Sequence, residues 1–190
     1  LTLGKEWLQK NVNQKIKTLL FGQELNPETF AICKADMLIT NEDPENIRIG
    51  TSFSKDQFKN QKFQYMIANP PYGVSWKSEE DFIKNESQNP NGRFSAGTPR
   101  TSDGQLLFIQ HLISKMDSGG SRIGIVFNGS PLFTGDAGGG ESEIRKWIIK
   151  NDLLESIICL PNQLFFNTGI TTYLWILTNS KPVKRKRKIQ

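Results

Sequence analysis

The feature that most constrains the fold of this chain is a regular alternation of short apolar runs with segments of helical spacing. Runs of strand length occupy residues 17–22, 46–49, 63–68, 122–127, 154–160 and 171–177. Apolar residues recur at helical spacing over residues 4–13, 26–38, 105–116 and 143–150. Such alternation is typical of a parallel sheet covered by helices on both faces. We therefore expect an α/β fold whose ligands bind at the carboxyl ends of the strands.

Two polar stretches do not fit this alternation. Residues 75–102 are aperiodic and rich in turn-forming residues, and a loop of that length is usually functional or disordered. Residues 134–140 are rich in glycine and precede an expected helix, but they lack the Gly-Lys-Ser/Thr ending of a phosphate-binding loop. We interpret this second stretch as a flexible connector.

The charge of the chain is concentrated at its C-terminal end. The formal net charge is +5, but six of the positive residues fall within 181–188, and the rest of the chain is close to neutral. This tail is compatible with a contact to nucleic acid, and equally with a solvated tail or an exposed edge. We expect one globular domain over residues 1–180 and a basic tail over residues 181–190.

Composition excludes several other classes of protein. Cys33 and Cys159 are far apart in the sequence and His111 is the one histidine, so we expect neither a metal site nor a disulfide scaffold. His111 falls on an apolar helical face and is interpreted as a packed histidine. No apolar run approaches the roughly 20 residues that span a bilayer, and the first residues do not resemble an export signal. We expect a cytoplasmic protein with no membrane partner.

The tetrapeptide Asn69-Pro70-Pro71-Tyr72 follows the expected strand at 63–68 and has a specific chemical use. The exocyclic amine of adenine is a poor nucleophile, because its lone pair is delocalised into the ring. The side-chain carbonyl of Asn69 and the backbone carbonyl of Pro70 can each accept one N–H and localise that lone pair. The prolines fix the backbone and add no competing N–H. Tyr72 can stack on a base taken out of the duplex.

A carboxylate occupies a comparable position earlier in the chain. Glu24 follows the expected strand at 17–22, and a carboxylate at such a strand end can accept hydrogen bonds from both ribose hydroxyls of a nucleoside cofactor. Taken alone, Glu24 would be an ordinary exposed residue before a helix. Together with Asn69 it suggests a site for a nucleoside cofactor and an amine-bearing substrate.

With these residues, the chain resembles the modification subunits of type I restriction-modification systems, which are adenine-N6 DNA methyltransferases. The segments that carry the resemblance are 21–30, 68–73, 103–111, 122–133 and 164–170. The resemblance implies a Rossmann-like methyltransferase sheet and S-adenosylmethionine as cofactor. It also implies double-stranded DNA, a specificity subunit, a restriction subunit and a second modification subunit as partners.

The resemblance also assigns roles to individual residues. Glu24 would bind the ribose of S-adenosylmethionine, and Asn69 and Pro70 would hold the adenine amine. Asn69 would also contact the cofactor. Tyr72 would stack on the flipped base, with Phe165 or Phe166 on its other face, although these two phenylalanines could equally anchor a loop. Where the family usually has an acid or Asn to meet the cofactor's adenine, this chain has Thr51, whose hydroxyl can still form a hydrogen bond.

One departure from the family pattern affects the expected activity. The first strand of the family and its glycine-rich loop, which approaches the methionine end of the cofactor, have no counterpart before residue 4. We therefore expect a partial catalytic domain that lacks its central N-terminal strand, and an isolated chain that is inactive and binds little cofactor.

Three alternatives compete with this interpretation. The same tetrapeptide would suit an N-methyltransferase that acts on a protein glutamine or on an RNA base. The chain could also be a non-catalytic assembly module of a restriction-modification complex. A cytosine-C5 methyltransferase is disfavoured, because neither Cys33 nor Cys159 follows a proline in a suitable nucleophile loop.

Overall fold

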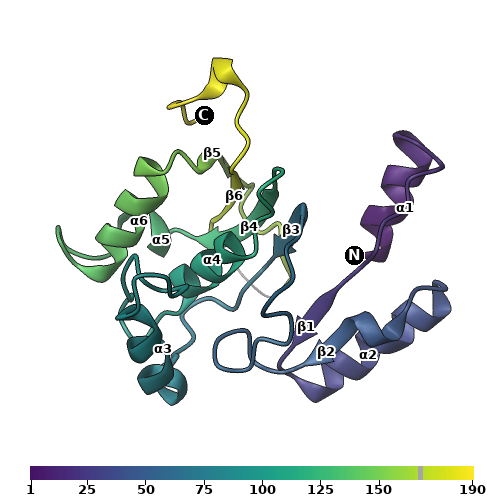
Figure 1. Cartoon of the computed structure of the whole chain (residues 1–190), viewed down its shortest axis with the longest axis horizontal. Helices are drawn as coiled ribbons and strands as arrows, with labels where there is room; N and C mark the ends of the chain where they lie inside the picture. The colour runs from purple at the N-terminus through teal and green to yellow at the C-terminus, as the bar shows by residue number, and fades with distance from the viewer. Residues whose placement is uncertain (167–168) are drawn as a thin grey trace. The chain divides into compact units, whose positions relative to one another are not determined.

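The computed structural model describes residues 1–166 and 169–190 of the chain, which divides into two compact units (Figure 1). The first unit is Leu1–Lys59 and the second is Asn60–Gln190. The helices and strands alternate largely where the apolar pattern predicts them. None of the described helices is both long enough and apolar enough to cross a membrane.

The first unit is a small α/β layer. Its elements in chain order are α1 (Thr2–Asn11), β1 (Gly22–Glu24), α2 (Pro27–Ile39), the 3-10 helix η1 (Pro44–Asn46) and β2 (Ile47–Ile49). Strands β1 and β2 pair in parallel, with Glu24 opposite Ile49. Leu20, Met37 and Ile47 form the buried core between α2 and the strands.

Helix α2 begins where the sequence predicts. The side chain of Asn26 accepts hydrogen bonds from the backbone N–H groups of Glu28 and Thr29, at 2.8 and 3.0 Å, and Pro27 takes the first helical position. The strand expected at 17–22 was misplaced, because β1 begins only at Gly22. A strand needs a hydrogen-bonded partner as well as apolar residues, and β2 supplies a partner for three residues only.

The second unit contains a four-stranded sheet in the order β3-β4-β6-β5. The strands are β3 (Tyr65–Ala68), β4 (Arg122–Asn128), β5 (Leu154–Cys159) and β6 (Thr172–Thr178). β3 and β4 are parallel, whereas β6 is antiparallel to both β4 and β5. The expectation of a wholly parallel sheet was therefore wrong in this strand. No helix lies in the described part of the segment between β5 and β6, so the chain can return directly beside β5 in the opposite direction.

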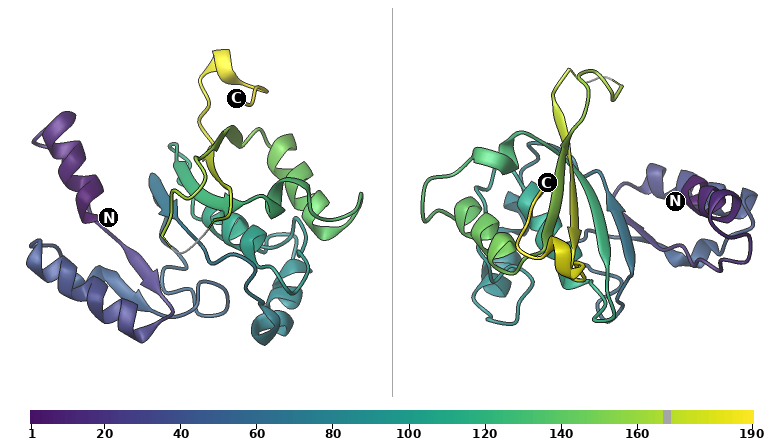
Figure 2. Two further views of the ribbon diagram at one scale, coloured as in Figure 1. Left: turned by 180° about the vertical axis from the view of Figure 1, so that it is seen from behind. Right: turned by 90° about the horizontal axis from the view of Figure 1, so that it is seen from above.

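Helices pack against one face of this sheet (Figure 2). The helices of the second unit are η2 (Lys77–Glu79), α3 (Glu80–Ser87), α4 (Gln105–Ser114), α5 (Ser130–Phe133), α6 (Gly140–Lys150) and η3 (Val183–Arg185). Side chains from α4 and α6 share one buried core with alternate residues of the strands. Within β3, Met66 points into this core, whereas its neighbour Ile67 is 69% exposed on the other face.

The long polar stretch at 75–102 is folded rather than irregular. It contains η2 and α3, and its scattered apolar residues Trp76, Ile83 and Phe94 are buried. Arg93 makes two hydrogen bonds to the Glu86 carboxylate, at 2.6 and 2.7 Å, and its third nitrogen lies 2.9 Å from His111 Nδ1. Burial raises the pKa of Glu86, but the hydrogen bonds and charge of Arg93 outweigh it, so the pKa is lowered overall. His111 is packed in this cluster, as expected.

The basic tail lies along the edge of the sheet. The backbone of Gln190 makes two hydrogen bonds to β5, accepting from Ile157 N at 2.9 Å and donating to Glu155 O at 3.1 Å. Lys181 is buried and donates to the Asp152 carboxylate at 2.6 Å. The sequence left open whether residues 181–190 are a solvated tail or part of an exposed edge of the fold, and these contacts favour the exposed edge.

The ion pair of the tail predicts a pH-dependent stability. Hydrogen bonds from the side chain of Lys181 and the backbone N–H of Arg187 lower the pKa of Asp152. A carboxyl whose pKa falls on folding stabilises the protein above its unfolded pKa of about 3.9, and this contribution is lost as the pH falls through its folded pKa. Asp152→Asn should therefore lower the free energy of unfolding at pH 7 but not at about pH 2. Urea denaturation at both pH values measures this.

The exposed Asp136 provides the control for this prediction. Asp136→Asn should change the stability little at either pH. An Asp152→Asn variant that loses the same stability at both pH values would show that the charge of Asp152 contributes nothing.

Candidate active site

The tetrapeptide Asn69-Pro70-Pro71-Tyr72 begins directly after the last residue of β3, as the sequence predicts. Ala68 lies opposite Ile125 of the parallel strand β4, so both strands end at the same edge of the sheet. Pro70 is buried against the protein, whereas Asn69 is exposed and Tyr72 is half-buried. The amide of Asn69 is therefore presented to solvent at the edge of the sheet where α/β proteins bind ligands.

Tyr72 is hydrogen-bonded to the amide of Asn69. Its hydroxyl donates to Asn69 Oδ1 at 2.8 Å. Burial raises the pKa of Tyr72, so the hydroxyl keeps its proton at neutral pH and acts as a donor. A carbonyl oxygen has two lone pairs, so Asn69 can accept one further hydrogen bond while Tyr72 fixes the orientation of its amide.

The backbone after Tyr72 is held by the segment that precedes α4. Gly104 N donates to Val74 O at 3.1 Å, and Trp76 N donates to Thr101 O at 3.1 Å. The buried Trp76 side chain adds a third contact, from its indole N–H to Arg100 O at 3.0 Å. The conformation of the tetrapeptide loop therefore depends on residues about 30 positions later in the chain.

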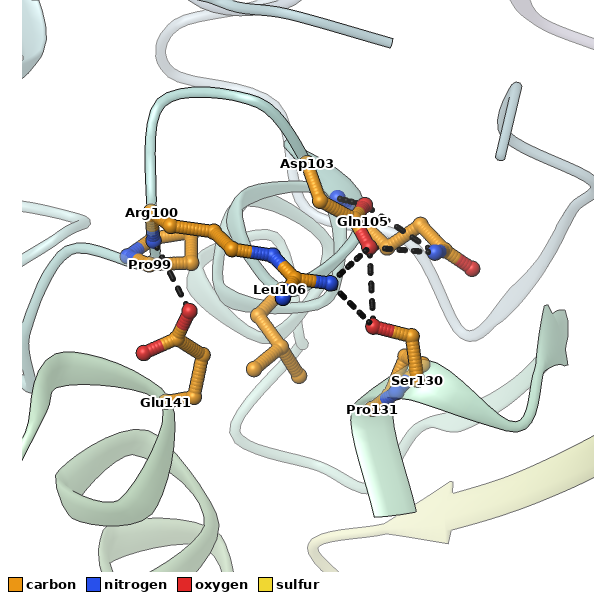
Figure 3. Close-up of a pocket in the computed structure, with 8 residues that line it drawn as sticks. All are labelled: Pro99, Arg100, Asp103, Gln105, Leu106, Ser130, Pro131 and Glu141. Atoms are coloured by element: carbon orange, nitrogen blue, oxygen red, sulfur yellow. Dashed lines mark hydrogen bonds and ion pairs between the residues drawn. The ribbon is translucent and has the colours of Figure 1, made fainter. Parts of the chain in front are cut away.

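Sequence reasoning missed a polar network at the same edge of the sheet (Figure 3). Asn128, the last residue of β4, accepts from Gln105 Nε2 at 3.0 Å and from Ser130 N at 3.0 Å. The side chain of Gln105 in turn contacts Asp103. A signal was present, because Asn128 is a polar residue at the end of an apolar strand, the same criterion that singles out Asn69.

Two of the residues expected to bind the cofactor, Glu24 and Thr51, lie together at one end of the first unit. Glu24 is the last residue of β1, and Thr51 follows the partner strand β2 by two residues. Glu24 Oε1 accepts from the N–H groups of Leu25 and Asn26, at 2.7 and 2.8 Å. Its other oxygen, Oε2, has no hydrogen-bond partner in the described part of the chain. This oxygen is available to a ribose hydroxyl.

Gly50 shapes the turn between β2 and Thr51. Its φ of 150° is one that side chains rarely adopt, and a Cβ there would lie 3.1 Å from Lys55 O. Its N–H donates to Glu24 O at 2.9 Å. The Thr51 hydroxyl accepts from Phe53 N at 3.2 Å. The structure thus brings Glu24 and Thr51 to the same end of the paired strands β1 and β2. Asn69 belongs to the second unit, and its contact with the cofactor stays a prediction.

The two candidate stacking residues follow β5. β5 runs parallel to β4, because both strands are antiparallel to β6. The segment that contains Phe165 and Phe166 therefore leaves the sheet at the same edge as Asn69. Phe165 is half-buried and Phe166 is fully exposed. Asn167 and Thr168, part of the segment 164–170 used for the resemblance, lie outside the described residues. The stacking roles of both phenylalanines stay predictions.

The family profile for N-6 DNA methylases matches residues 1–190, the whole chain. The chain belongs to this family. A methylase subunit of the type I restriction enzyme HindI from Haemophilus influenzae is 31% identical over 182 residues, which are 95% of this chain and 38% of that protein. The MjaIX methylase subunit from Methanocaldococcus jannaschii is 30% identical over 173 residues, 90% of this chain and 30% of the relative.

Solved structures agree on the fold of this chain. A type I restriction-modification methyltransferase subunit from Streptococcus thermophilus superposes with a TM-score of 0.78, covering 99% of this chain and 39% of that chain at 24% identity. The EcoKI M protein gives a TM-score of 0.65 at 23% identity, covering 100% of this chain and 38% of that one. The expected α/β fold class is confirmed, but the helices of the second unit pack against one face of their sheet and not against both as expected. This chain spans about a third of the length of the curated relatives it matches.

Proposed function

We propose that this chain carries catalytic residues of a DNA adenine-N6 methyltransferase that uses S-adenosylmethionine. The observation that carries the proposal is the exposed Asn69 amide at the carboxyl end of β3, oriented by the hydroxyl of Tyr72. Family membership adds DNA as the substrate class. The proteins that the chain resembles are methylase subunits of type I restriction enzymes. We infer a cytoplasmic complex with specificity and restriction subunits and a second modification subunit.

The residues at the tetrapeptide account for activation of the amine. Asn69 Oδ1 accepts one N–H of the adenine amine and the backbone carbonyl of Pro70 accepts the other, which draws the nitrogen toward tetrahedral geometry. The restored lone pair then accepts the methyl group as the bond from that methyl to sulfur breaks, which leaves a neutral thioether, and the nitrogen releases one proton to solvent. No covalent bond to the protein is needed, because the stabilisation is strongest for the developing positive charge on nitrogen. Tyr72 offers its ring as a stacking surface for the base.

The first unit contains groups that fit a nucleoside cofactor. S-adenosylmethionine supplies an electrophilic methyl group on a positively charged sulfur. Glu24 has one oxygen held by two backbone N–H groups and the other available, so the carboxylate is fixed before the ribose arrives. Thr51, at the same strand end, offers a hydroxyl to the adenine ring. A fixed acceptor loses little side-chain entropy on binding, which favours affinity.

The substrate class is tested with radiolabelled S-adenosylmethionine. The complete modification protein and its specificity partner should transfer label to duplex DNA, and digestion of that DNA should release N6-methyladenine. RNA and a glutamine-bearing protein substrate should stay unlabelled. Label in either of them but not in DNA would replace the proposal with the corresponding alternative. A complex that assembles without any transfer would favour the non-catalytic assembly module.

Glu24→Ala is expected to weaken cofactor binding. Hydrogen bonds to a charged group contribute about 1.5–3 kcal/mol each, so the Kd for S-adenosylmethionine should rise roughly 10- to 150-fold. Calorimetric titration of the complete protein measures the Kd. Glu28→Ala is the matched control, because this exposed carboxylate lies in the first turn of α2. Equal Kd values for Glu24→Ala and the unmodified protein would remove Glu24 from the cofactor site.

A further inference from the structure

The polar network at the ends of β3 and β4 centres on the carboxylate of Asp103. Asp103 is 7% exposed, and its Oδ2 accepts from the Ser130 hydroxyl at 3.0 Å. Both of its oxygens accept from Gln105 Nε2, each at 3.0 Å. The guanidinium of Arg100 lies farther away, 3.8 Å from Oδ2 (Figure 3). Neutral donors therefore make the close contacts to this enclosed negative charge.

A local turn explains only part of this arrangement. Asp103 Oδ1 accepts from Gln105 N, two residues on, at 3.2 Å, in the turn that leads into α4. An exposed carboxylate would do that equally well, and burial of a charge costs free energy unless other groups satisfy it. The contact to Ser130 reaches the first residue of α5, and the Gln105 side chain in turn contacts Asn128 at the end of β4.

The network also connects to the loop that carries Asn69. Asp103 directly precedes Gly104, whose N–H holds Val74 O, and Arg100 and Thr101 accept the two N–H groups of Trp76. Gly104 also packs beside Trp76, because a Cβ there would be in van der Waals contact with the Trp76 ring at 3.4 Å. Movement of residues 100–104 would therefore be transmitted to 74–76 and to the tetrapeptide before them.

We propose that Asp103 is a positioning residue for methyl transfer: it ties residues 100–104 to the end of β4 and so fixes the loop that presents Asn69. The proposal rests on the proposed function. Asp103 acts through this loop and touches no reacting atom. Misplacement of a catalytic group by about 1 Å can cost on the order of 100-fold in rate, so a small shift of this loop should lower kcat.

The test compares steady-state kinetics of the complete protein with its specificity partner. Asp103→Asn keeps the shape of the side chain but replaces one acceptor oxygen with a donor, which conflicts with Gln105 Nε2 in either orientation of the amide, because both Asp103 oxygens accept from that nitrogen. We expect kcat to fall at least about tenfold, while the KM for S-adenosylmethionine stays within about twofold. Ser130→Ala removes one donor to Asp103 with less risk to folding, and should lower kcat by about three- to tenfold.

Glu86→Gln is the matched structural control. It weakens a half-buried polar pair in the same unit, with Arg93, whose side chain bonds to Glu86 and lies beside His111. This variant should lower the melting temperature and leave kcat unchanged. If Asp103→Asn or Ser130→Ala folds and keeps the kcat of the unmodified protein, the positioning role is wrong. An equal loss of kcat in Glu86→Gln would also overturn it, because the effect would then follow stability alone.

The unmodified complex and Asn69→Ala distinguish a failure of the Asp103 proposal from a failure of the proposed function. If the unmodified complex methylates DNA and Asn69→Ala abolishes transfer, the function stands whatever Asp103→Asn does. If the unmodified complex transfers no methyl group to DNA, the proposed function fails first. In that case Asp103 loses its role as well.

Discussion

Asn69→Ala is expected to lower kcat for adenine methylation by about 10²- to 10³-fold, the usual cost of removing one fixed polar group that stabilises a transition state. The substitution removes Oδ1, the oxygen that Tyr72 orients and that one N–H of the adenine amine needs. Affinity for S-adenosylmethionine should change little if the main cofactor contacts come from Glu24 and Thr51. Methyl transfer by the complete complex, measured at saturating cofactor, gives kcat directly.

Two comparisons make the Asn69 result specific. Asn91→Ala removes an equally exposed asparagine from the loop after α3, and it should leave kcat unchanged. Assembly with the specificity partner should be the same for both variants, because an exposed side-chain truncation does not alter the core. Methylation by Asn69→Ala at the rate of the unmodified complex would show that Asn69 is not a catalytic residue.

The tetrapeptide could be placed from the sequence because its position depends on local signals. An apolar run ends at Ala68, and two prolines then prevent the strand from continuing in a ladder. The N-terminal cap of α2 at Asn26 was predictable for the same reason, since capping depends on residues within one helical turn. Both features require no knowledge of what packs nearby.

The support around the tetrapeptide could not be predicted, because it joins segments far apart in the chain. Gln105 contacts Asn128, 23 positions later, and Trp76 bonds to Arg100, 24 positions later. Nothing in the local sequence of either partner specifies such a pairing. The direction of β6 was missed for a related reason, since strand direction depends on the whole connection and not on the strand's own residues.

Close backbone approach explains one further departure from expectation. The glycine-rich stretch at 134–140 was interpreted as a flexible connector, yet its last residue, Gly140, is in tight contact with the backbone. A Cβ on Gly140 would lie 1.7 Å from Thr98 O, so only glycine fits at this position. Gly140 therefore allows the start of α6 to pack closely against the segment before α4.

Phe127→Ala should produce the largest loss of stability among the substitutions considered. Phe127 lies on β4 with 0% of its side chain exposed, and its ring packs edge-to-face on Trp175 of β6, with centroids 5.4 Å apart. Truncation of a buried phenylalanine removes its transfer free energy and leaves a cavity, so the free energy of unfolding should fall by about 3–5 kcal/mol. Urea denaturation followed by far-ultraviolet circular dichroism measures this change.

Phe133 provides the matched control for Phe127 within the same unit. Its side chain is 74% exposed on α5, so Phe133→Ala should change the free energy of unfolding by no more than about 0.5 kcal/mol. The dependence of the unfolding free energy on urea concentration should be the same for both variants if each unfolds from the same compact state. A loss below about 1 kcal/mol for Phe127→Ala would mean that the core around β4 can collapse into the cavity, contrary to the packing described.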